Sequence, residues 1–150
     1  MLKFSSTNNN TQTTVEYLCV QTKSGVKSGI SAMENNVSRK FIIADLLFED
    51  GSKKRVMRIA KSSNFDIQHR YIYDEMLSEF KDILIKPLYG GRVLRDDDSK
   101  TIFLWDRSLG FPAEPNWVEV TRILREGLEK EYSSYSIKCD LECDLEHKRR

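Results

Sequence analysis

One histidine, His69, has a sequence position at which its ring could do chemistry. It is one of only two histidines in 150 residues, and it falls in the first turn or so of a predicted helix. Near a helix N-terminus the macrodipole disfavours imidazolium, so the ring stays neutral and available as a base or nucleophile. The same helix end attracts phosphate. The alternative interpretation is a partly buried histidine that only packs and hydrogen-bonds.

Three cations are candidates to bind an anion beside such a histidine. Lys40 opens one predicted strand, Arg58 lies on its hairpin partner, and Arg92 follows a pair of glycines. Each of them alone fits a solvated surface charge. Together they favour an anion site, because a sheet could bring Lys40 and Arg58 together and a guanidinium matches phosphate oxygens.

A loop over residues 106–113 follows a predicted strand and carries Ser108 and Gly110. Its hydroxyl and backbone amides could form an anion nest. Ordinary strand-to-helix connections use the same residue types, so both interpretations stay open.

The C-terminal segment contains Cys139, Cys143 and His147 at four-residue spacing. A helix would align them on one face, but a closed structural zinc site needs four ligands. A charged tail is the favoured alternative, and no metal site is predicted. Walker A, HExxH, GxSxG and dinucleotide GxGxxG motifs are absent from the sequence.

The composition excludes several classes of protein. A net charge of +1 argues against a generic nucleic-acid or membrane-surface binder, and no apolar run is long enough to span a bilayer. Three cysteines do not make a disulfide framework, so the reducing cytoplasm is the default location. A monomer is taken as the default state. The length suits one domain over residues 15–139, between a disordered polar tail (1–14) and a charged tail (140–150).

Hydrophobic periodicity predicts the elements that must position these residues. Strands are predicted over residues 15–20, 41–48, 54–60, 83–88, 92–95, 101–105 and 135–139. One helix begins near Asn64 or Asp66 and runs to about Phe80, and a second runs from about Asn116, a plausible N-cap, to Lys130. The stripe of the first helix that should face the sheet consists of His69, Ile72, Tyr73, Met76, Leu77 and Phe80.

The connections between these elements also have sequence signals. Residues 23–38 are rich in Gly, Ser and Asn and predict a long loop. Asp50-Gly51 predicts a hairpin turn, Pro87 an edge or a bulge, and Gly90-Gly91 a break in the strand. The resulting fold class is α/β, a mixed β-sheet with two helices packed on it.

Four segments, in order, resemble the phosphohistidine phosphatases, also called the janus/ocnus family. They are Arg39–Ile43, Gln68–Asp74, Leu88–Val93, and Lys100–Trp105 followed by Ser108. The resemblance covers about two-thirds of the chain and rests on the ordered set, with His69 in register.

The resemblance implies a function as well as a fold. It implies hydrolysis of a phosphoramidate bond, on protein phosphohistidine or phospholysine, without metal or cofactor. The residues it implies are His69 as general base or nucleophile, Lys40 as a substrate-binding cation, Ser108, Leu109 and Gly110 as the phosphate-binding loop, and Arg58 and Arg92 as further phosphate ligands.

The chain departs from the family pattern around this loop. Tyr89 and Asp106 replace glycines, Arg107 adds a charge, and Glu114 stands near where the family has a second histidine. Asp106 would oppose a bound phosphate and Arg107 could offset it. Two alternatives therefore stay open: a non-catalytic binder of phosphoproteins, and a paralogue that has lost activity.

Overall fold

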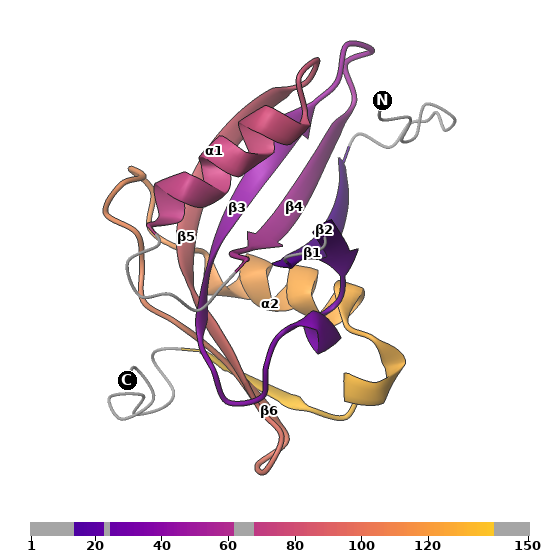
Figure 1. Cartoon of the computed structure of the whole chain (residues 1–150), viewed down its shortest axis with the longest axis vertical. Coiled ribbons are helices and arrows are strands. Elements are labelled where there is room, and N and C mark those ends of the chain that lie inside the picture. The colour runs from indigo at the N-terminus through magenta and orange to yellow at the C-terminus, as the bar shows by residue number, and fades with distance from the viewer. Residues whose placement is uncertain (1–13, 23–24, 62–67, 140–150) are drawn as a thin grey trace.

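A computed structural model describes residues 14–22, 25–61 and 68–139. It contains one seven-stranded sheet in the order β2-β1-β4-β3-β5-β6-β7 (Figure 1). The strands are β1 (Thr14–Thr22), β2 (Gly25–Ser28), β3 (Arg39–Leu47), β4 (Lys53–Ile59), β5 (Leu84–Asp96), β6 (Thr101–Trp105) and β7 (Ser136–Cys139). The helices are α1 (His69–Glu79) and α2 (Trp117–Gly127), with short 3₁₀ turns η1 (Ile30–Ala32) and η2 (Lys130–Tyr132). The sheet is mixed, because β1 pairs with β4 and β6 with β7 in parallel while the other pairings are antiparallel.

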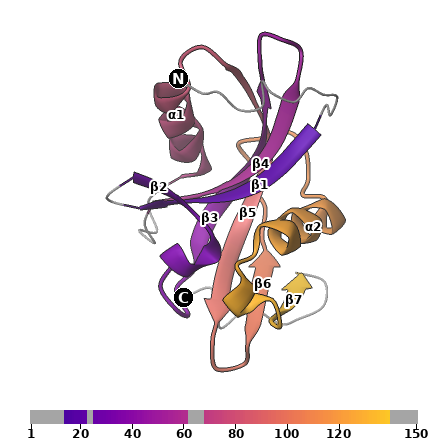
Figure 2. The ribbon, with the colours of Figure 1, turned by 90° about the vertical axis from the view of Figure 1, so that its right-hand side faces the viewer.

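The two helices cover opposite faces of the sheet (Figure 2). Ile72 and Met76 of α1 pack on one face, against Ile42 and its neighbours. The apolar side of α2 (Val120, Ile123 and Leu124) packs on the other face, in the larger core. The predicted fold class, a mixed sheet with two packed helices, is confirmed.

A bulge in β5 decides which side chains face α1. Ala44 pairs with Pro87 and Ile43 with Tyr89, so the register shifts at the intervening Leu88. Because side chains alternate along a strand, one extra residue turns every later side chain to the opposite face. The bulge expected at Pro87 is confirmed, and it directs Gly90 towards α1.

Several local predictions hold. Asn116 caps α2 by accepting a hydrogen bond from the Glu119 amide at 3.1 Å. Gly51 has φ of 89° in the β3–β4 turn, as its Asp-Gly sequence predicts.

Other local predictions are wrong. The expected loop over 23–38 contains β2 and η1, because pairing with β1 overrides the loop-like composition. The expected break at Gly90-Gly91 does not occur, since β5 runs through both glycines.

Three further corrections concern the helices. α1 begins at His69 after Gln68, which supplies no side-chain cap, and the expected caps Asn64 and Asp66 lie outside the described residues. Leu77, expected on the buried stripe, lies on the exposed side of this short helix. α2 ends at Gly127, and the residues near Lys130 form η2 instead.

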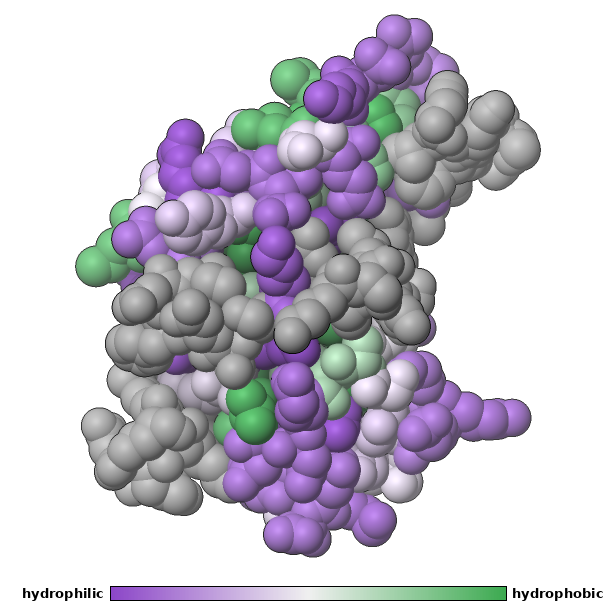
Figure 3. All heavy atoms as spheres, viewed as in Figure 1, coloured by the Kyte–Doolittle hydropathy of each residue, from purple (hydrophilic) through white to green (hydrophobic). Residues whose placement is uncertain are grey.

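The face with α1 in front is mostly hydrophilic, with separate hydrophobic spots rather than one broad patch (Figure 3). No helix in the described ranges 14–22, 25–61 and 68–139 is both long and apolar enough to cross a membrane. The predicted tails lie mainly outside these ranges.

Candidate functional site

His69 is the first residue of α1, and its ring lies against β5. Its Nε2 lies 2.9 Å from the carbonyl oxygen of Gly91, and the side chain is buried, with 9% of the residue exposed. A Cβ at Gly90 would lie 2.7 Å from His69 Cδ2. The two glycines therefore have different uses: Gly90 gives the ring room, and Gly91 supplies its hydrogen-bond acceptor.

This contact determines which ring nitrogen of His69 carries the proton. A carbonyl oxygen only accepts hydrogen bonds, so Nε2 must be the protonated donor. In neutral imidazole the lone pair then resides on Nδ1. Within the part of the chain that the structure describes, Nδ1 has no hydrogen-bond partner. The ring is thus held by one nitrogen and presents the other as a base or nucleophile.

The surroundings of His69 favour this neutral form. Burial is the main cause that lowers its pKa, and the nearby charges of Lys40 and Arg92 lower it further. The contact with Gly91 and the Asp106 carboxylate act in the opposite direction, but the net shift is downward from 6.5. This shift favours the uncharged ring, with its single proton on Nε2, at neutral pH.

The cations that act on His69 come from two adjacent strands. Lys40 of β3 and Arg92 of β5 are directly opposite each other in the antiparallel register. Like charges in such a position destabilise a sheet unless an anion lies close by. Adjacent strands carry Lys40 and Arg58, as expected, but the residue directly opposite Arg58 is Ile42 and not Lys40.

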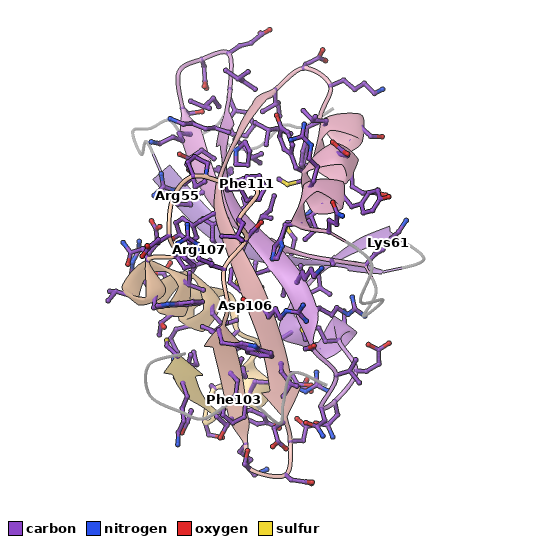
Figure 4. All side chains as sticks on the ribbon, turned by 90° about the vertical axis from the view of Figure 1, so that its left-hand side faces the viewer. Arg55, Lys61, Phe103, Asp106, Arg107 and Phe111 are labelled. Carbon is purple, nitrogen blue, oxygen red and sulfur yellow. The ribbon has the colours of Figure 1, made fainter. Side chains whose placement is uncertain are left out.

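The anion next to this pair is Asp106, the first residue after β6. Its Oδ2 accepts a hydrogen bond from Arg92 Nε at 2.9 Å, and its Oδ1 accepts one from the Arg107 amide, also at 2.9 Å. Its φ of 73° lies in the left-handed region, which glycine adopts freely and aspartate tolerates. Figure 4 places Asp106 and Arg107 where the chain leaves β6, with Phe111 further along the same loop.

The predicted phosphate-binding loop turns tightly around Ser108. Ser108 is buried, its Oγ accepts a hydrogen bond from the Gly110 amide at 3.2 Å, and its carbonyl accepts one from Phe111 at 3.4 Å. The Phe111 ring packs in the core beneath α1, which holds the loop on the His69 side of the sheet. Among the described residues, the amides of Ser108 and Leu109 have no partner. These two amides, rather than that of Gly110, are the candidate donors to an anion.

Arg58, another predicted phosphate ligand, makes its contacts at the other end of α1 from His69. Its residue is only 1% exposed, and its Nη2 donates to Glu79 Oε1 at 2.8 Å, at the opposite end of α1 from His69. Its guanidinium also lies 5.8 Å from the centroid of the Phe80 ring. Its Nε and Nη1 are buried and have no hydrogen-bond partner among the residues that the structure describes. Arg58 therefore packs against α1 and is not part of the candidate site.

This placement predicts opposite effects for the two partners of the Arg58–Glu79 pair. Arg58→Met removes a buried charge and two buried nitrogens that lack a hydrogen-bond partner. The free energy of unfolding should therefore stay within about 1 kcal/mol of its original value or rise. Glu79→Ala leaves the buried guanidinium without its partner and should cost about 1–3 kcal/mol. Urea unfolding measures both. Loss of ligand binding at His69 in a folded Arg58→Met protein would show that Arg58 does belong to the candidate site.

A second prediction concerns the titration of His69. NMR of the ring should show a proton on Nε2, a bare Nδ1 and a pKa below 6.5. Any activity that needs the bare Nδ1 should be at its maximum at pH 7 and should fall as the pH drops through the pKa of the ring. Asp106→Asn should lower the pKa further, because the Asp106 carboxylate raises it. A proton on Nδ1 at pH 7 would contradict this description.

Of the remaining sequence candidates, the structure describes Cys139 alone. Cys143 and His147 lie outside the described residues, and Cys139 Sγ lies 3.4 Å from Thr121 Oγ1. Within the described ranges, no group of three or more His, Cys, Asp or Glu side chains is arranged to hold a metal ion.

Two features of the site were missed by sequence reasoning. The Gly91 carbonyl, which sets the tautomer of His69, has no side-chain signal, although glycines inside a strand often mark a close approach. The contact between Asp106 and Arg92 was also missed, because only the β5–β6 pairing brings the two residues together: Arg92 is opposite Trp105, the residue before Asp106.

The fold and site together define a mixed α/β protein with a neutral, anchored histidine beside a small cationic cluster. Comparison of the sequence with models of protein families finds no match, and a search of curated proteins finds no significant match.

Proposed function

We propose that the chain is a phosphohistidine phosphatase of the janus/ocnus type, which hydrolyses a P–N bond with His69 as general base or nucleophile. The observation that carries the proposal is the state of His69: neutral, anchored through Nε2 to Gly91, and open at Nδ1 beside Lys40 and Arg92. The ordered sequence resemblance supports the same class, including its specific fold.

The arrangement suits both possible roles of the ring. As a base, Nδ1 takes a proton from the attacking water while the new O–P bond forms and the P–N bond breaks. As a nucleophile, Nδ1 bonds to phosphorus while the P–N bond of the substrate breaks, and water cleaves the new bond in a second step. In either case the ring becomes cationic, and the Nε2–H contact with the Gly91 carbonyl stabilises that charge. The proton that the leaving nitrogen needs comes from solvent or from the protonated ring.

The anion-binding groups act on the transferred phosphoryl group. The positive charge of Lys40 and the amides of Ser108 and Leu109 would stabilise its equatorial oxygens. A P–N bond is already labile once its nitrogen is protonated, so the proposed reaction needs no metal. The proposed substrates are proteins carrying phosphohistidine or phospholysine, acted on by a cytoplasmic monomer.

The direct test is phosphate release from a phosphohistidine peptide by the purified full chain, in the presence of a chelator. We expect turnover of this peptide and of phospholysine, and much slower turnover of a phosphoserine peptide, whose leaving group is a poor one. Absence of turnover on every P–N substrate would contradict the proposal.

One observation favours a second candidate, a non-catalytic binder of phosphoproteins. The Asp106 carboxylate bonds to Arg92 and adds negative charge where a phosphate would bind. A binder would retain a non-hydrolysable phosphohistidine analogue without turnover, and its affinity would not change in His69→Gln.

A further inference from the structure

The contacts of Asp106 are those of a bound anion. Its carboxylate accepts one hydrogen bond from the Arg92 guanidinium and one from the Arg107 backbone amide. A guanidinium N–H and a loop amide are also the two kinds of donor that proteins use to bind phosphoryl groups. The side chain therefore occupies an anion site made by its own neighbours.

The backbone holds the carboxylate in this site. With φ of 73°, Asp106 adopts a left-handed conformation that only glycine, asparagine and aspartate adopt readily. Arg92 is in turn fixed in the middle of the sheet, between β3 and β6. The contact thus joins two side chains whose backbones are held by a strand and by the left-handed conformation of Asp106.

The charges around the anion site explain why the Asp106 carboxylate lies in it. Lys40 and Arg92 lie opposite each other, and the Asp106 carboxylate is the anion whose contact with Arg92 offsets their repulsion. A phosphoryl group would supply the same compensation. It cannot share the site with the carboxylate, because the two anions repel each other.

We propose that Asp106 is an internal ligand of this anion site, which an incoming phosphoryl group must displace from Arg92. The proposal rests on the proposed function for the nature of the natural ligand, a phosphorylated protein side chain. Free phosphate has only its own oxygens with which to displace the carboxylate. The internal ligand weakens the binding of free phosphate and of a phosphoprotein by the same factor, so a phosphoprotein, which adds contacts along its chain, can still bind where free phosphate, the product, is released.

The test is binding of inorganic phosphate to the full chain, followed by ³¹P NMR or calorimetry. Asp106→Gly removes the carboxylate and suits the left-handed backbone, so it should bind phosphate about tenfold tighter or more than the natural chain. Asp106→Asn also suits this backbone and keeps an acceptor for the Arg107 amide. Its affinity for phosphate should lie between those of the natural chain and of Asp106→Gly. Thermal unfolding checks that all three proteins are folded.

Arg92 provides the matched control. In the double variant Asp106→Gly, Arg92→Gln the gain in phosphate affinity should be lost. If Asp106→Gly binds phosphate no tighter than the natural chain, or if the double variant keeps the gain, Asp106 is not an internal ligand. Phosphate binding needs no turnover, so failure on phosphohistidine peptides would overturn the proposed function without touching this result.

Discussion

Replacing His69 by alanine or glutamine should reduce turnover of a phosphohistidine peptide by about 10³-fold or more. Alanine removes both ring nitrogens. Glutamine can still donate a hydrogen bond to the Gly91 carbonyl, which His69 Nε2 now contacts at 2.9 Å, but it provides no basic nitrogen in place of Nδ1. The two variants thus separate the structural contact of the ring from its chemical role.

Stability and chemical rescue provide the controls for this expectation. The alanine variant loses a buried side chain and should unfold about 1–3 kcal/mol more easily, whereas the glutamine variant should lose less. Added imidazole should restore part of the activity to the alanine variant, above its reaction with the substrate in the absence of protein. Turnover within a few-fold of the natural chain in both folded variants would show that His69 is not the reacting group.

The second large effect is expected at Gly90, which carries no functional group. A Cβ there would lie 2.7 Å from both His69 Cδ2 and the Phe41 carbonyl oxygen. The overlap with the Phe41 carbonyl requires β3 and β5 to shift, and the overlap with Cδ2 requires the ring to move, so its contact with Gly91 must be disturbed. Because misplacing a reacting group by about 1 Å can cost 10²-fold, Gly90→Ala should lower kcat/KM by about that factor.

Gly127→Ala is the matched control for the steric effect of an added Cβ that does not touch His69. Its Cβ would also lie at 2.7 Å from a neighbour, the Leu18 side chain, but on the α2 face of the sheet. Both variants should lose about 1–3 kcal/mol of stability through overpacking. Only Gly90→Ala should lose activity per folded molecule, as measured by initial rates together with urea unfolding. Equal activity of the two variants would mean that the position of the His69 ring is unimportant.

Much of the fold could be predicted because its signals are local. The Asn116 cap and the apolar spacing of α2, and the Asp50-Gly51 turn between β3 and β4, depend only on neighbouring residues. β2 could not be predicted, because its strand is formed by pairing with β1 and not by its own Gly- and Ser-containing sequence.

The candidate site was predictable only in part, for a related reason. The helical spacing placed His69 near a helix start facing the sheet. The opposition of Lys40 and Arg92 depends on the bulge at Leu88, and a shift of one residue would have turned Arg92 to the other face. The burial of Arg58 depends on Glu79, a partner from a different element. Sequence periodicity indicates which face of a helix or strand a residue lies on. These contacts also depend on the register between neighbouring strands, which the periodicity does not give.

The sheet order separates the candidate site from both edges of the sheet. The strands β4-β3-β5-β6 are joined by antiparallel pairings only, and β3, β5 and the end of β6 carry Lys40, Arg92 and Asp106. Beyond β4 lie β1 and β2, and beyond β6 lies β7. We therefore expect transient fraying of either edge of the sheet to leave the geometry around His69 in place.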